Sequence, residues 1–72
     1  MFLYLTFGST HGALRAEALL RSSAVDCRIV PKPRAIRGSC GLALRVSLAE
    51  AEHALAVLEA DGHPPRQQAH LA

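Results

Sequence analysis

A helix between two short strands is the feature that most restricts the fold of this chain. Residues 10–22 have small and apolar side chains at helical spacing, and they lie between two short apolar segments, 2–7 and 27–30. A helix that joins two strands of one sheet requires a crossover, which is right-handed in nearly all proteins. Ser9 or Thr10 can cap this helix by accepting a backbone N–H bond.

The second half of the chain adds a strand, 40–46, and a second helix. The stretch from Ser47 to Glu50 has the pattern of a capping box, and Gly62 can end the helix by turning left-handed. The buried stripe expected on this helix consists of Leu48, Ala51, Leu55 and Leu58. The order β-α-β-β-α predicts a small α+β fold, a split β-α-β plait. Its sheet contains antiparallel strands, and both helices lie on one face.

The length of 72 residues allows a single domain, which we place at residues 1–62. Residues 63–72 have little to bury and are expected to form a flexible C-terminal tail. The usual last strand of the plait is therefore either missing or supplied by this tail. A missing strand leaves a sheet edge open, and two copies of the chain can pair there as a homodimer.

The positive charge is concentrated in the middle of the chain. No acidic residue lies between Arg28 and Arg45, although the net charge of the whole chain is only +2. This net charge is too small to indicate nucleic acid, and no aromatic residues are interleaved with the basic ones to stack on bases. The apolar stretch 1–7 is too short for a signal peptide or a membrane span. We therefore expect a cytoplasmic protein with no nucleic-acid or membrane partner.

Cys40 is either a small core residue or a reactive thiol. On the expected strand it points to the same face as Leu42, and free cysteines are often buried, so the pattern by itself favours the core. Three features favour reactivity: Cys40 begins its strand, Gly41 lets another molecule approach, and nearby cations favour the thiolate. If the first and third strands are antiparallel, the start of the 10–22 helix also lies close to Cys40 and favours the thiolate further.

The other cysteine, Cys27, is expected to be a core residue and no disulfide partner for Cys40. A hairpin closed by the loop 31–38 is expected to place Cys27 opposite Leu42 or Ala43, too far along the ladder for a bridge to Cys40. The two cysteines and four scattered histidines show no metal-ligand spacing, so neither a metal nor another cofactor is expected.

Three segments of the chain together resemble a known family. They are LYLTFGSTHGALRAEALL, RIVPKPR and GSCGLALRV, and the most specific part is Pro-x-Pro-Arg followed by Ser-Cys-Gly. In this order and spacing they resemble the selenium/sulfur carrier protein-like family of small bacterial domains. The resemblance implies that Cys40 holds a sulfur or selenium atom as a persulfide or selenopersulfide, with donor and acceptor proteins as partners.

The sequence thus supports three hypotheses, of which the first is a carrier protein rather than an enzyme. The second is a non-catalytic binding or regulatory module of the plait type. The third is a thiol redox protein, which would need a resolving thiol from another chain because Cys27 is badly placed. For the carrier, Cys40 is the reacting residue. The residues expected to stabilise its thiolate or to dock partners are Ser9, Thr10, Lys32, Arg34, Arg37, Ser39 and Gly41.

Overall fold

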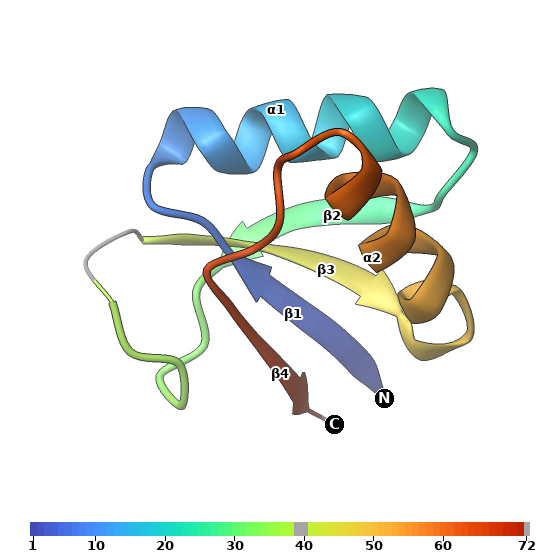
Figure 1. The fold of residues 1–72 in the computed structure, drawn as a ribbon. Helices are drawn as coiled ribbons and strands as arrows, with labels where there is room; N and C mark the ends of the chain where they lie inside the picture. The colour runs from blue at the N-terminus through green and yellow to red at the C-terminus, as the bar shows by residue number, and fades with distance from the viewer. Residues whose placement is uncertain (39–40, 72) are drawn as a thin grey trace.

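The chain forms a small α+β fold with one antiparallel sheet of four strands and two helices (Figure 1). The computed structural model describes residues 1–38 and 41–71, so Ser39, Cys40 and Ala72 lie outside the described residues. The elements are β1 (Phe2–Thr6), α1 (Thr10–Ser22), β2 (Cys27–Pro31), β3 (Leu42–Ser47), a short 3-10 helix (Leu48–Glu50), α2 (Ala51–Ala60) and β4 (Gln67–Leu71). Neither helix in this described part is long and apolar enough to span a membrane.

The strands lie in the order β2-β3-β1-β4, and each strand is antiparallel to its neighbours. The pairing of β1 with β3 places Leu5 opposite Leu44. The expected antiparallel pairing of the first and third strands is therefore confirmed. It brings the start of β3 beside the end of β1, from which the chain continues into α1 at Thr10. The expected position of Cys40 near this helix start lies outside the described residues.

Both helices pack against the same face of the sheet, as predicted. Leu3 and Leu5 of β1 and Leu44 of β3 are fully buried in one cluster with residues of both helices. The helix residues buried in this cluster are Ala13, Ala16 and Leu20 of α1 and Ala54 and Leu58 of α2. Because α1 contributes mostly alanine, its backbone can lie close to the sheet.

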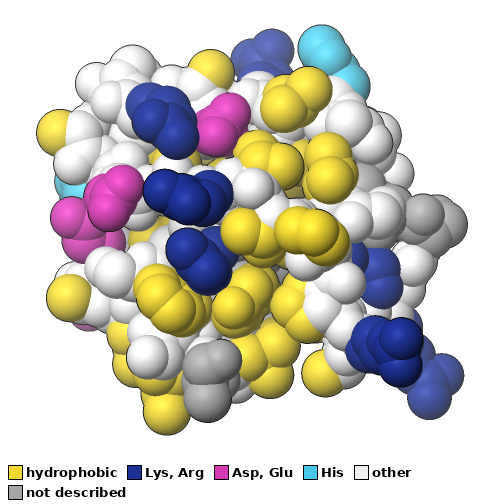
Figure 2. All heavy atoms as spheres, turned by 180° about the vertical axis from the view of Figure 1, so that it is seen from behind, with side chains coloured by type: hydrophobic (Ala, Val, Ile, Leu, Met, Phe, Trp, Pro, Cys, Tyr) yellow, Lys and Arg dark blue, Asp and Glu magenta, His cyan; other side chains and the backbone are white. Residues whose placement is uncertain are grey.

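The opposite face of the sheet has no helix on it. Phe2, Tyr4 and Arg45 lie there half-buried, since their neighbours along each strand point into the core. The Arg45 guanidinium lies 4.4 Å from the centre of the Phe2 ring, and the Phe2 and Tyr4 rings meet edge to face. Seen from behind, the molecule shows hydrophobic side chains gathered between two groups of basic side chains (Figure 2).

The two helices begin differently. Ser9 caps α1 as expected, because its hydroxyl accepts the Gly12 N–H at 3.1 Å. The capping box predicted for the second helix is wrong, since Ser47 makes no side-chain cap bond. The chain first forms the 3-10 helix 48–50, and the Glu50 carboxylate instead accepts the backbone N–H of Asp26 at 2.9 Å. A side-chain contact between distant segments has replaced the local cap.

The 3-10 helix also changes the buried stripe of the second helix. Of the four residues predicted for it, Leu58 is fully buried and Ala51 and Leu55 are half-buried, but Leu48 is 40% exposed. Leu48 lies before α2, so it does not share the α-helical periodicity of the others. Ala54, which the prediction omitted, is fully buried.

The last strand of the sheet comes from the segment expected to be a flexible tail. Of the two alternatives for this strand, missing or supplied by the tail, the structure shows the second. Gly62 turns with φ 71° as expected, and His63 then stacks on the Phe7 ring with centroids 5.4 Å apart. Residues 67–71 pair with β1, from Gln67 opposite Thr6 to Leu71 opposite Phe2. β4 therefore covers the edge of β1, and a homodimer through a sheet edge would have to pair through β2 or β4.

Candidate functional site

The structure describes the predicted site through the residues on either side of Ser39 and Cys40, which are outside the described residues. The Lys32 N–H donates to the Gly41 carbonyl at 2.8 Å and so extends the β2–β3 pairing by one residue at each strand. Gly41 is exposed, and a Cβ added there would meet nothing within 4 Å. The backbone at Gly41 itself is therefore accessible to solvent.

The loop from Lys32 to Gly38 has its own internal contacts. Its backbone turns at Ile36, whose N–H donates to the Pro33 carbonyl at 3.0 Å, and the Ile36 side chain is buried. The Lys32 ammonium group donates to the Ile36 carbonyl. Gly38 has φ +138°, a conformation that side chains with a Cβ rarely adopt. These features fix the path of the basic loop up to the residue before Ser39.

A small cavity of about 30 Å³ lies where this loop meets the end of β1 and the start of β4. Its walls include Thr6, Gly8, Lys32, Arg37, Arg66 and Gln67. The side-chain amide of Gln67 donates to the Arg37 carbonyl and so joins the C-terminal segment to the loop. Of the predicted site residues, the structure therefore brings Lys32 and Arg37 together around one cavity.

Besides Gly41, three other predicted site residues do not line this cavity. Arg34 is on the same loop and exposed, but it does not line the cavity. Ser9 and Thr10 are exposed at the start of α1, where Ser9 serves as the helix cap. Gly8, one residue before Ser9, is the nearest point of this turn that the cavity reaches.

The cavity is lined by cations that have no carboxylate partner in the described part of the chain. Within residues 1–38 and 41–71 the ion pairs are Arg15 with Asp61 and Arg21 with Glu17. The cations without a carboxylate partner in that part of the chain thus include Lys32, Arg34, Arg37 and Arg66. In Figure 2 the basic side chains at the lower right, over the loop that follows β2, likewise have no acidic side chain beside them. Such a surface attracts anions.

The cavity residues that sequence reasoning missed include Thr6, Arg66 and Gln67. Thr6 looked like an ordinary strand residue, and the other two belong to the expected tail. A usable signal was present in the tail, because Ala69 and Leu71 alternate with polar residues after two prolines. That pattern is typical of a short edge strand.

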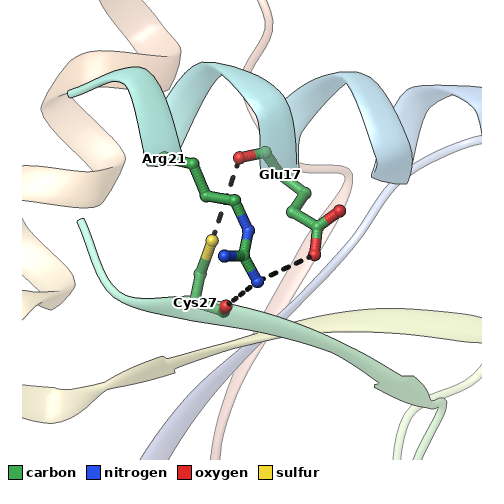
Figure 3. A network of polar contacts seen from close by, with 3 residues as sticks. All are labelled: Glu17, Arg21 and Cys27. Atoms are coloured by element: carbon green, nitrogen blue, oxygen red, sulfur yellow. Dashed lines mark hydrogen bonds and ion pairs between the residues drawn. The ribbon is translucent and has the colours of Figure 1, made fainter. Parts of the chain in front are cut away.

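Cys27 is a core residue, as predicted. It is 4% exposed, and its thiol contacts the Glu17 carbonyl with an Sγ–O distance of 3.9 Å (Figure 3). Burial raises the pKa of the Cys27 thiol. The Arg21 charge opposes that rise, whereas Glu17, Asp26 and Glu50 add to it. The thiol is therefore neutral at neutral pH and is a poor nucleophile.

The register expected for Cys27 is wrong. Cys27 lies opposite Val46, near the far end of β3, and not opposite Leu42 or Ala43. The reason is that the pairing continues along all of β2, so that Pro31 at its other end lies opposite Leu42. The Arg21 guanidinium, which also contacts Glu17, donates to the Cys27 carbonyl at 3.1 Å and so ties α1 to the start of β2 (Figure 3).

The histidines do not form a metal site in the described part of the chain. His63 lies over the start of α1, with Nε2 3.1 Å from the Gly12 carbonyl, and His11 is exposed. Across residues 1–38 and 41–71, no three side chains of the types His, Cys, Asp and Glu are grouped as metal ligands.

The fold and the cavity define a small α+β domain with cations at one end of its sheet that have no carboxylate partner among the described residues. The chain belongs to the family described as "Putative Se/S carrier protein-like", whose match covers residues 2–68. The resemblance found in the three sequence segments is thereby confirmed. No curated protein and no solved structure matches the chain significantly.

Proposed function

We propose that this protein carries sulfur or selenium as a persulfide or selenopersulfide on Cys40. Membership of the selenium/sulfur carrier protein-like family is the observation that carries the proposal. The surroundings of the described neighbours support it, because Lys32 and Arg37 on the preceding loop have no carboxylate partner among the described residues. Positive charge near a cysteine favours the thiolate, which is the form that attacks sulfur.

The transfer itself needs no oxidant. The Cys40 thiolate attacks the terminal sulfur of a donor persulfide, a new S–S bond forms on Cys40, and the old S–S bond breaks. The donor cysteine leaves as a thiolate, so that sulfur and electrons balance. The same exchange with an acceptor thiolate unloads the carrier. A selenium atom would move by the corresponding attack on a selenopersulfide.

The other cysteine of the chain does not compete for this chemistry. Cys27 is buried and its pKa is raised, so we expect its neutral thiol neither to load sulfur nor to resolve an oxidised Cys40. A redox protein would therefore need a resolving thiol from another chain. The partners that we propose are acidic surfaces on the donor and acceptor proteins, which dock against the basic loop. A reducing compartment such as the cytoplasm would keep Cys40 reduced.

The proposal is tested by loading the protein with sulfur and measuring its mass. The protein is incubated with a cysteine desulfurase and cysteine, and intact-mass and peptide mass spectrometry then locate the added sulfur. We expect one additional sulfur atom on the peptide that contains Cys40, no adduct in Cys40→Ser, and an unchanged adduct in the matched control Cys27→Ser. An adduct on Cys27 alone, or none at all, would disprove sulfur loading on Cys40.

A further inference from the structure

The cavity at the end of the sheet is assembled from segments that are far apart in the sequence. β1 supplies Thr6, the loop after β2 supplies Lys32 and Arg37, and the segment that leads into β4 supplies Arg66. The Arg66 N–H donates to the Thr6 carbonyl at 2.7 Å, which fixes the Arg66 backbone against β1. The site therefore exists only in the folded chain.

The cationic side chains of the cavity have N–H groups that are not all hydrogen-bonded to described residues. A Cβ added to Gly8 would lie 3.6 Å from Cζ of Arg66, so the guanidinium group lies against the bare backbone of this glycine. The side chains of Arg37 and Arg66 form no ion pair within residues 1–38 and 41–71. Lys32 uses one of its three N–H donors on the Ile36 carbonyl. Several charged donors are therefore available to a ligand.

Thr6 gives an independent indication of a ligand. It is 3% exposed and lines the cavity, and its hydroxyl oxygen is buried without a hydrogen-bond partner among the described residues. Buried hydroxyl groups in native proteins nearly always have a partner, and an exception calls for an explanation. A ligand with hydrogen-bonding oxygens in the adjoining cavity would supply that partner.

We propose that the cavity binds a small inorganic oxyanion of the phosphate or sulfate type. Guanidinium, ammonium and hydroxyl donors match oxygen acceptors that carry negative charge, and the guanidinium groups can bind two such oxygens at once. The cavity volume of about 30 Å³ is far below the usual range of sites for drug-sized ligands, so the ligand is small. Binding involves no bond to Cys40 and does not depend on the carrier function.

The test is a titration of the ¹⁵N-labelled protein with inorganic sulfate and, separately, inorganic phosphate at constant ionic strength in chloride. We expect saturable shifts of the Gly8, Gly38 and Gln67 amide signals. Arg66→Ala should weaken binding at least tenfold. Its matched control, Arg34→Ala, removes an exposed cation that does not line the cavity and should change the affinity less than twofold.

Two further variants keep the result interpretable. Thr6→Val removes only the hydroxyl and should weaken binding severalfold in a folded protein, even if Arg66→Ala is unstable. Cys40→Ser should bind as the parent does, which separates this inference from sulfur loading. Shifts that do not saturate, or equal losses in Arg34→Ala and Arg66→Ala, would overturn the site. Binding of a nucleoside monophosphate without binding of inorganic phosphate would refute the proposal that the ligand is inorganic.

Discussion

Replacing Thr6 by valine should stabilise the protein when no oxyanion is present. The Thr6 hydroxyl is buried with no partner among the described residues, and a group of this kind costs about 1–3 kcal/mol of stability. Valine has nearly the same shape and is also β-branched, so it suits the β1 backbone equally well. We expect the free energy of unfolding to rise by about 1 kcal/mol, or ~4–8 °C in Tm for a domain of this size.

The assay is urea unfolding followed by circular dichroism in a chloride buffer free of sulfate and phosphate. The matched control is Val46→Thr, which places a hydroxyl into the apolar core at a residue that is 1% exposed and should cost about 1–3 kcal/mol. Added sulfate should stabilise the parent protein more than Thr6→Val, since binding to the folded state raises stability. A Thr6→Val protein that is less stable than its parent in chloride would mean that the hydroxyl already has a favourable partner, and the reasoning would fail.

Two further predictions concern Cys27 and the helix caps. The first is made in a Cys40→Ser background, so that Cys27 is the only thiol. Below pH 9.0, the ordinary pKa of the thiol, titration of Cys27 should not affect the free energy of unfolding. This free energy should fall as the pH rises through the higher pKa of the folded state, because the unfolded chain ionises first. Urea unfolding between about pH 7 and 10.5 measures this, and the fall should be smaller in Cys27→Ala/Cys40→Ser; equal slopes would contradict it. Ser9→Ala should cost about 1 kcal/mol because it removes the α1 cap, whereas Ser47→Ala, which removes no cap bond, should cost little in the same assay. Equal losses in the two serine variants would refute the assignment of the caps.

The parts of the fold that sequence predicts well are those fixed by local patterns. The Ser9 cap, the alanine-rich face of α1 and the turn at Gly62 each depend on neighbouring residues, and all three are present in the structure. The capping box failed because Glu50 bonds to Asp26, a residue 24 positions away that local pattern does not indicate. The Cys27 register failed for a related reason, since the extent of the β2–β3 pairing is set by the whole hairpin.

The residues of the candidate site likewise divide into those that a local pattern predicts and those that only the folded chain brings together. The basic loop with Lys32 and Arg37 is visible in the sequence because its cations lie within six residues of the chain. Arg66 was missed because it reaches this loop only when β4 pairs with β1, and the local signal for that strand is limited to the short alternation at Ala69 and Leu71. A short edge strand buries little, so its pairing partner decides its structure more than its own residues do.

The antiparallel order of the strands also separates the two cysteine-bearing segments. Cys27 begins β2 at the end of the sheet where Phe2, Val46 and the acidic side chains of Asp26 and Glu50 lie. Lys32 follows the other end of β2, beside Gly41 and the cations of the cavity. At the Cys27 end, burial raises the pKa of the thiol and the carboxylates add to the rise, although Arg21, Arg28 and Arg45 also lie there. The cations that line the cavity at the other end have no carboxylate partner among the described residues. The site that we propose for the oxyanion therefore lies at the end of the sheet away from the buried Cys27 thiol.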